Sequence, residues 1–371
     1  MSNYINISKP IIKKEELKAV TDVLNSGSIV QGKKVMELEN EFAKFCKTKY
    51  AVATNNGTSA LHTALHSIGL KKDDEVITTP FTFVATANSI LMAGAKPVFV
   101  DIDEKTYNLD PKKIQAAITT KTKALLVVNI YGQPVNYEEI NKIAKKNKLI
   151  VVEDAAQSID AEYKGKKSGS FADIACFSLY ATKNIMCGEG GMITTNNNVY
   201  FEKARFFRQH GQDENKKYEY FGLGYNYRMM DLQAAIACVQ LKRLQNITKQ
   251  RQMNAQKYNR TFNGIKGLVV PYCDKNSSHV YHQYTLRITS EFPLSRKKFI
   301  EQLKEKGIQA NIYYPIPLYS FPHLIPNGVK VSDFPVTIKA VQEVVSIPVH
   351  PSLSSHDVEF IIKTIINSSK L

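Results

Sequence analysis

Lys183 stands in the stretch YATKNIMCGEGG, between two apolar runs that are each long enough for a strand. Glycine, alanine and apolar neighbours would keep water from this lysine, which disfavours its charged form and lowers its pKa. A neutral amine can form a Schiff base with an aldehyde. The glycines after it allow the backbone to pass close to a ligand. Taken alone, a lysine in a loop is usually a solvated surface charge, so other residues must decide its role.

Two further stretches carry groups that suit the same chemistry. NNGTSAL places Gly57, Thr58 and Ser59 at the start of an expected helix, where free N–H groups and two hydroxyls form an anion site. VVEDAAQ places Asp154 directly after an apolar run, where a carboxylate can keep a heterocyclic nitrogen protonated. Each stretch alone is typical of a plain helix cap. Neither matches GxGxxG or GxxxxGK[ST], which argues against a dinucleotide site or a P-loop.

The order of these groups suits pyridoxal phosphate. The anion site would hold its phosphate, the acid about 100 residues later its pyridinium nitrogen, and the lysine about 29 residues further its aldehyde carbon. Phe83, in PFTFVATAN, offers a stacking partner for the ring, although an aromatic at such a position is usually part of a core.

Short apolar runs between residues 50 and 195 predict the elements that position these groups. The runs are apolar on both faces, which is typical of strands in a mostly parallel sheet covered by helices. Ligands bind such sheets beyond the carboxyl ends of the strands, where the stretches with Thr58, Phe83, Asp154 and Lys183 all fall. The runs predict a doubly wound α/β domain with seven strands: 50–54, 75–79, 96–102, 123–130, 149–154, 173–180 and 190–195.

The rest of the chain predicts a second, smaller α/β domain. Residues 230–262 lack glycine and proline and have helical periodicity, which predicts a long helix leading out of the large domain. A strand over 281–288, a helix closing on Gly307 and a final helix capped by Ser355 are expected after it. We therefore expect a large cofactor-binding domain, residues 1–249, and a small domain, residues 250–371.

The composition excludes several classes of protein. The chain has 371 residues, of which 43% are hydrophobic and 22% charged, as in an ordinary globular protein. Neither a membrane-spanning run nor a signal peptide is expected. Five scattered cysteines without a CxxC pair predict reduced thiols in a cytoplasm and no metal site. The net charge of +15 is dispersed and lacks a nucleic-acid-binding motif, but it is compatible with a substrate that carries phosphates.

Together these stretches resemble the DegT/DnrJ/EryC1/StrS family of sugar aminotransferases, within fold type I of the pyridoxal-phosphate enzymes. The resemblance runs from about residue 8 to about residue 350. It implies the transferase fold of that type, with a mostly parallel seven-stranded sheet in the large domain. The matching stretches are SGSIVQGKKVMELE, NNGTSAL, TPFTFVATAN, VVEDAAQS, FSLYATKNIMCGEGGM, GYNYRMMDLQAA, HVYHQYTLRI and IYYPIPL.

The resemblance implies a role for individual residues. Lys183 would form the internal aldimine with pyridoxal phosphate, and Asp154 would pair with the ring nitrogen. The other cofactor contacts would be Gln157 beside the ring hydroxyl, Phe83 over the ring, and Gly57, Thr58, Ser59 and Ser178 around the phosphate, joined by Asn226 from a neighbouring subunit.

Substrate contacts are implied in the same way. Arg228, Tyr313 and Tyr314 match positions that reach the nucleotide-sugar across a dimer. Tyr319 stands where many relatives have a sugar-contacting histidine. The active site would then be complete only in a homodimer.

The implied activity is transfer of an amino group from L-glutamate to a nucleotide-linked keto-sugar, for amino-sugar and surface-glycan biosynthesis such as that of O-antigen. The cofactor would alternate between its pyridoxal and pyridoxamine forms with ping-pong kinetics. The short loop from Lys183 to GEGG favours a 4-keto-6-deoxy sugar over a 3-keto sugar.

Three alternatives stay open at this point: a keto-cyclitol aminotransferase, a sugar 3-dehydratase and a non-catalytic regulator. Family dehydratases carry histidine at the lysine position, so Lys183 argues against the second. The intact set of Lys183, Asp154 and Gln157 argues against the third.

Overall fold

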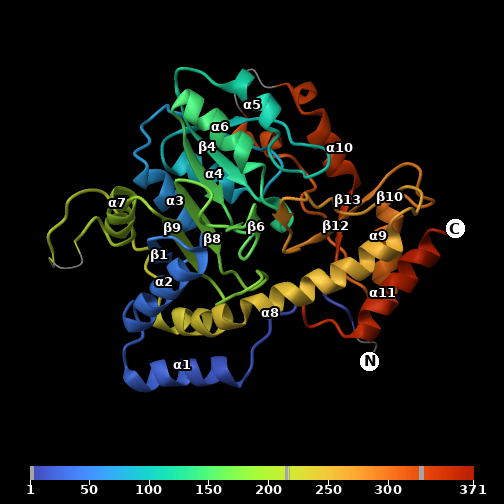
Figure 1. The fold of residues 1–371 in the computed structure, drawn as a ribbon, viewed down its shortest axis with the longest axis horizontal. Helices are drawn as coiled ribbons and strands as arrows, with labels where there is room; N and C mark the ends of the chain where they lie inside the picture. The colour runs from blue at the N-terminus through green and yellow to red at the C-terminus, as the bar shows by residue number, and fades with distance from the viewer. Residues whose placement is uncertain (1–3, 214–215, 217, 326–329) are drawn as a thin grey trace.

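The computed structural model describes residues 4–213, 216, 218–325 and 330–371. Figure 1 shows a larger α/β body built on one central sheet and a smaller body at the C-terminal end of the chain. The long helix α8 (Asp231–Phe262) runs along both bodies. Its length follows from the absence of glycine and proline in this stretch.

The central sheet has seven strands, in the order β1-β9-β8-β5-β4-β2-β3. All neighbouring pairs from β8 to β3 are parallel, and only β9 runs antiparallel to its neighbours. Each of the seven predicted runs overlaps one strand, which confirms the predicted fold class. The strands are β1 (Tyr50–Thr54), β2 (Glu75–Thr78), β3 (Lys96–Phe99), β4 (Thr122–Val128), β5 (Ile150–Asp154), β8 (Ile174–Ser178) and β9 (Gly191–Thr195).

Both faces of this sheet are buried, as the apolar runs predict. Along β8, Ile174 and Cys176 pack on the face covered by α3 (Gly57–Ser67), whereas Ala175 and Phe177 pack on the face covered by α2 (Lys33–Cys46) and α8. Successive side chains of a strand point to opposite faces, so both parities must be apolar. The other helices of this body are α1 (Lys14–Ser26), α4 (Ala85–Met92), α5 (Pro111–Ala117), α6 (Tyr137–Asn147) and α7 (Asn198–Arg208).

The register of the parallel strands brings their carboxyl ends together. Val128 of β4 lies opposite Asp154 of β5, and Asp154 lies opposite Cys176 of β8. Four 3₁₀ segments of three residues each belong to the connections in the described part of the chain: Ile130–Gly132 after β4, and Leu318–Ser320, Pro322–Leu324 and Val331–Asp333 between α9 (Arg296–Glu305) and α10 (Pro335–Glu343). A small separate sheet has the order β11-β6-β7, formed by β11 (Ser277–Ser278), β6 (Glu162–Tyr163) and β7 (Lys166–Lys167).

The smaller body is built on a sheet with the order β10-β12-β13. Its strands are short, and α9, α11 and the second half of α8 pack on them, whereas α10 packs in a cluster with residues of the larger body. The elements are β10 (Leu268–Val269), β12 (Tyr284–Ile288), β13 (Val344–Ile347), α9 (Arg296–Glu305), α10 (Pro335–Glu343) and α11 (Ser355–Ser368).

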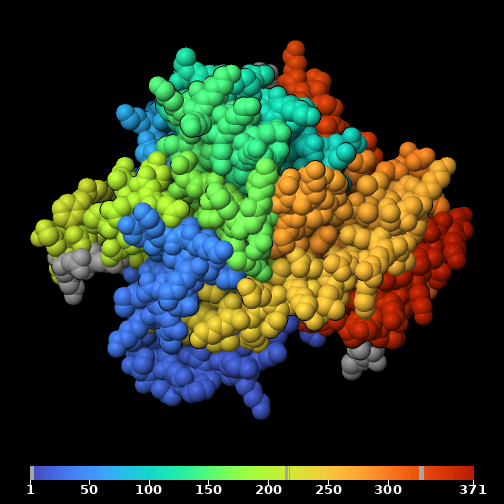
Figure 2. All heavy atoms as spheres, viewed as in Figure 1, coloured from blue at the N-terminus to red at the C-terminus, as the bar shows by residue number. Residues whose placement is uncertain are grey.

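Helix α8 crosses the expected domain limit at residue 249 without a break. Leu241 packs in the core of the larger body, and Tyr258 packs in the core of the smaller one. Figure 2 shows the N-terminal segment in blue against the first half of α8 and the C-terminal segment in red beside its other end. Ile5, which a limit at residue 249 assigns to the large domain, packs in the core of the smaller body and pairs with Ile308.

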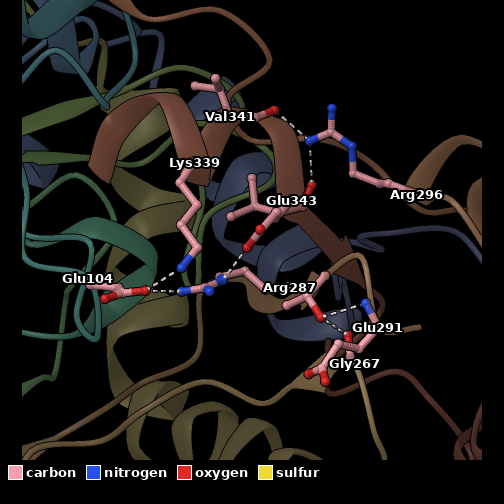
Figure 3. Close-up of polar contacts among 10 residues, drawn as sticks. Glu104, Gly267, Arg287, Glu291, Arg296, Lys339, Val341 and Glu343 are labelled. Carbon is pink, nitrogen blue, oxygen red and sulfur yellow. Dashed lines mark hydrogen bonds and ion pairs between the residues drawn. The ribbon is translucent and has the colours of Figure 1, made fainter. Parts of the chain in front are cut away.

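Charged side chains also join the two bodies (Figure 3). Arg287 of β12 donates to Glu343 at the end of α10, with an N–O distance of 2.7 Å, and to Glu104 of the larger body at 3.3 Å. Lys339 of α10 reaches the same oxygen of Glu104 at 2.7 Å. Arg296 donates to the carbonyl oxygens of Val341 and Val344, and so joins α9 to the end of α10. These contacts orient the smaller body against the larger one.

Two local predictions need correction. The cap of α11 is Ser354, not Ser355: the Ser354 backbone is extended, its hydroxyl accepts from the Asp357 N–H, and Asp357 accepts from the Ser354 N–H. The strand predicted over 281–288 begins only at Tyr284. None of the helices in the described part of the chain combines the length and the apolar character that a bilayer crossing requires.

Candidate active site

A cavity of about 740 Å³ opens beyond the carboxyl ends of β5 and β8, beside the N-terminus of α3. The smaller body contributes one part of its wall. Ten of the residues predicted to form the site line this cavity: Gly57, Thr58, Ser59, Phe83, Asp154, Gln157, Ser178, Lys183, Tyr313 and Tyr314.

The N-terminus of α3 forms one end of the cavity. Asn56 caps this helix, and its side-chain oxygen accepts from the Ser59 N–H at 2.8 Å and from the Ser59 hydroxyl at 3.1 Å. A Cβ on Gly57 would lie 2.9 Å from the Cβ of Ser178, so only glycine lets α3 approach the end of β8 this closely. N–H groups at a helix start and nearby hydroxyls attract anions. This end of the cavity is therefore suited to a phosphate.

Asp154, the last residue of β5, lies on the cavity floor with only 4% of its surface exposed. Its Oδ2 accepts from the Thr86 hydroxyl at 2.8 Å, and its Oδ1 accepts from the Ala156 N–H at 3.2 Å. Burial raises the pKa of Asp154, while these two donors and the charge of Lys183 oppose the rise. No cationic side chain among the described residues donates a hydrogen bond to this carboxylate. A cationic ring nitrogen in the cavity would supply the missing partner.

Lys183 stands in the tight loop between β8 and β9. Hydrogen bonds from the Lys183 N–H to the Tyr180 carbonyl, at 2.8 Å, and from the Ala181 N–H to the Gly188 carbonyl, at 3.0 Å, fix this loop. Burial lowers the pKa of Lys183 to about 8, against the opposing effect of Asp154. In the described part of the chain, no group forms a hydrogen bond with Lys183 Nζ. An amine with this pKa is partly neutral near physiological pH and can act as a nucleophile or a base.

Gln157 is held from two sides. Its Oε1 accepts from the Tyr131 N–H at 2.7 Å, and its Nε2 donates to the Tyr314 hydroxyl at 3.1 Å. Phe83 lies at the rim, with its ring centre 6.3 Å from that of Tyr314. Tyr313 and Tyr314 therefore belong to the cavity of their own chain. The Tyr314 hydroxyl contacts Gln157 of the same chain, and the action of both tyrosines across a dimer stays a prediction.

Three predicted residues do not line the cavity of their own chain. Asn226 is exposed and pairs with Gln209 in the segment before α8. Arg228 lines a separate hollow of about 380 Å³. Tyr319 is buried in an apolar cluster, where its ring stacks on Phe334 with centres 4.7 Å apart.

Sequence reasoning missed several cavity residues. Thr86 lies in the first turn of α4, and its hydroxyl lies 3.1 Å from that of Thr82, which precedes the helix. Helical spacing therefore does not predict this contact. His282 and Gln283 were assigned to a strand. They instead belong to an irregular segment whose position depends on contacts with the loop after β4. No pattern in the sequence predicts that contact.

The cavity fits a ligand with a phosphate, a basic ring nitrogen and a reactive carbonyl, which are the groups of pyridoxal phosphate. The phosphate would meet Thr58, Ser59 and Ser178, the ring nitrogen Asp154, and the carbonyl Lys183. The volume of about 740 Å³ leaves room for a second molecule beside such a ligand.

Comparisons with known proteins agree with this geometry. The model of the DegT/DnrJ/EryC1/StrS aminotransferase family matches residues 10–366. A pleiotropic regulatory protein of Geobacillus stearothermophilus is 41% identical over 95% of this chain and 94% of its own length. A UDP-2-acetamido-2-deoxy-3-oxo-D-glucuronate aminotransferase of Pseudomonas aeruginosa is 39% identical over 93% of each chain. The structure of Helicobacter pylori PseC, an aminotransferase involved in the biosynthesis of pseudoaminic acid, superposes with a TM-score of 0.94 at 30% identity, and covers 99% of this chain and 100% of that one.

Proposed function

Because the chain belongs to the DegT/DnrJ/EryC1/StrS aminotransferase family and is a sugar aminotransferase, we propose that it moves the amino group of L-glutamate to a nucleotide-linked keto-sugar with pyridoxal phosphate as its cofactor. The observation that carries this proposal is the single cavity that Lys183, Asp154 and the start of α3 share. Bound pyridoxal phosphate supplies an aldehyde that takes up the amino group. It also supplies a protonated ring that accepts the electron pair left on the donor α-carbon when that carbon loses its proton.

Asp154 holds the proton on the ring nitrogen. A carboxylate that is buried and accepts from Thr86 and Ala156 has one fixed orientation, so it presents the same oxygen to the ring throughout the reaction. The Thr86 hydroxyl also favours the charged form of Asp154. Thr86 is in turn fixed by its contact with Thr82.

Lys183 moves the proton. Its free amine would take a proton from the α-carbon of the amino donor and deliver it to the cofactor carbon that holds the transferred nitrogen. A pKa of about 8 suits both directions of this step, because both the neutral amine and its ammonium form are populated near neutral pH. Gln157 would lie beside the ring hydroxyl and is itself held by Tyr131 and Tyr314.

A homodimer would complete the site. Asn226 and Arg228 lie outside the cavity of their own chain, in the segment before α8, where they are available to a second copy. We propose that Asn226 reaches the partner's phosphate end and that Arg228 reaches the nucleotide-sugar. The net charge of +15 is compatible with a substrate that carries a diphosphate.

The position of the ketone is either C4, which the short lysine loop favours, or C3, which the name of the Pseudomonas aeruginosa relative contains. A half-reaction followed by absorbance decides between them. The chain loaded with pyridoxal phosphate receives L-glutamate and then, separately, UDP-, dTDP- and GDP-linked 4-keto-6-deoxy and 3-keto sugars. We expect glutamate to remove the visible absorbance and one of the sugars to restore it. No loss with either glutamate or glutamine would contradict the proposal.

A further inference from the structure

His282 lies on the cavity wall, in the irregular segment 280–283 that precedes β12. Only 6% of its surface is exposed. Its Nδ1 is buried and has no hydrogen-bond partner among the described residues. A buried polar atom without a partner is costly, so a donor that shares the cavity and is able to move is expected to reach it.

A second histidine in the same stretch, His279, has a hydrogen-bond partner for its Nδ1. His279 is equally buried, but its Nδ1 accepts from the Tyr281 N–H at 2.9 Å and its ring stacks on that of Tyr281, with centres 4.1 Å apart. His279 does not line the cavity. In the stretch HVYHQ, the Nδ1 atom of His279 therefore has a hydrogen-bond partner within the fold. His282 lines the cavity, and its Nδ1 has no such partner among the described residues.

The backbone of His282 is fixed from two directions. The N–H groups of Val280 and Gln283 donate to the carbonyls of Gly132 and Tyr131, in the loop after β4, at 3.0 and 3.3 Å. From α8, Arg251 donates to the carbonyl of His282 itself at 3.2 Å. The ring therefore has little freedom to leave the cavity wall.

The charged groups that face His282 are both cations, Lys183 from the cavity and Arg251 from α8. Together with burial, they hold the pKa of His282 well below its usual value. The imidazole stays neutral and is able to accept a hydrogen bond. Lys183 Nζ is a donor, and it also makes no hydrogen bond to any described residue.

We propose that His282 is a positioning residue for Lys183, whose side-chain nitrogen, in its ammonium form, donates a hydrogen bond to the neutral imidazole. Lys183 then has Asp154 and His282 as two fixed neighbours, one attracting its charge and the other setting its direction. This inference rests on the proposed role of Lys183, but not on the identity of the sugar or the donor.

The test measures the titration of Lys183 in the full-length chain freed of cofactor. Acetic anhydride labelling of Lys183 is followed by mass spectrometry as a function of pH in wild type, His282→Leu, His282→Gln and the matched control His279→Gln. A lost hydrogen bond to the ammonium form lowers the pKa, so we expect the labelling midpoint to fall by about one pH unit in His282→Leu. His282→Gln retains an acceptor and should stay close to wild type, as should His279→Gln. An unchanged midpoint in His282→Leu, or an equal fall in His279→Gln, would overturn the inference.

A second measurement covers the case in which His282→Leu does not fold. In the ¹⁵N-histidine-labelled chain, Lys183→Met should move the ring-nitrogen resonances of His282 and leave those of His279 in place. Unmoved His282 resonances would overturn the inference. A separate experiment tests the proposed function: added pyridoxal phosphate should protect Lys183 from labelling by acetic anhydride. If protection occurs without an effect of His282, only the present inference fails, and if it is absent while His282 still has its effect, only the cofactor role of Lys183 fails.

Discussion

Asp154 and Lys183 face one cavity from neighbouring strand ends, and each favours the charged form of the other. Burial alone would make Asp154 a weaker acid and Lys183 a weaker base. Their mutual attraction opposes both effects. The outcome is a lysine whose pKa is about 8, next to a carboxylate with two neutral donors.

Lys183→Ala should abolish turnover and leave the fold intact, because Lys183 is the only lysine among the described residues that line the cavity, while the packed walls remain. Some binding of pyridoxal phosphate should survive through the phosphate end. Steady-state assays and circular dichroism test this, with Lys166→Ala, which changes an exposed lysine of β7, as the control. Full activity in Lys183→Ala would contradict the proposed mechanism.

Lys183→Met should stabilise the cofactor-free chain at neutral pH. The pKa of Lys183 falls from 10.5 to about 8 on folding, so the folded state binds fewer protons than the unfolded state between these values. Burial of the charged lysine therefore lowers the free energy of unfolding. This loss is full below pH 8 and disappears as the pH rises toward 10.5. We expect a gain of about 1–3 kcal/mol in the free energy of unfolding at pH 7, which shrinks at pH 10. Denaturant unfolding at both pH values measures it, and a gain that does not depend on pH would argue for a packing effect.

Thr86→Val should raise the pKa of Asp154, because its carboxylate loses a donor that favours the charged form. The acidic limb of the pH–rate profile should move to higher pH, and activity at pH 7 should fall about ten-fold. Ser89→Ala is the control, since Ser89 lies on the same helix but donates to the Thr86 carbonyl instead. Equal losses in both variants would mean that the helix, not the hydroxyl, matters.

Gly57→Ala should weaken the binding of pyridoxal phosphate, because the new Cβ would lie 2.9 Å from the Cβ of Ser178 and push α3 away from β8. Overpacking of this kind costs about 1–3 kcal/mol of stability. Titration with pyridoxal phosphate measures the loss of affinity, and thermal unfolding measures the loss of stability. Adding Ser178→Gly removes the contact and should restore stability but not the phosphate affinity, and a double variant as unstable as the single one would refute this explanation.

Mixed dimers of Lys183→Ala and Asn226→Ala should regain activity. In a mixed dimer, one site combines the intact Lys183 of one chain with the intact Asn226 of the other. Random mixing gives half of the dimers this composition with one intact site each, so about a quarter of wild-type activity is expected. Activity no higher than that of either parent would remove the support for a shared site.

The sequence by itself determined the sheet and the side chains beyond its strand ends. Seven runs that are apolar on both parities require burial on both faces, and parallel strands bring their carboxyl ends to one edge. Thr58, Asp154 and Lys183 therefore meet although about 125 residues separate the first from the last. The run 230–262, which lacks glycine and proline, likewise predicts the long helix that leads out of the large domain, and α8 occupies residues Asp231–Phe262.

Only the tertiary structure decided which side chains support these groups. Thr86 reaches Asp154 because α4 packs on the sheet, and Tyr314 reaches Gln157 because the smaller body closes against the larger. Tyr319 packs into a core, although its sequence neighbours suggested a contact with the sugar. His282 follows the same rule: the carbonyls of Tyr131 and Gly132 and the guanidinium of Arg251 hold its segment, and they lie about 150 and 30 residues away along the chain. Periodicity reports only on neighbours within one element, whereas these contacts form between elements and depend on how their faces pack.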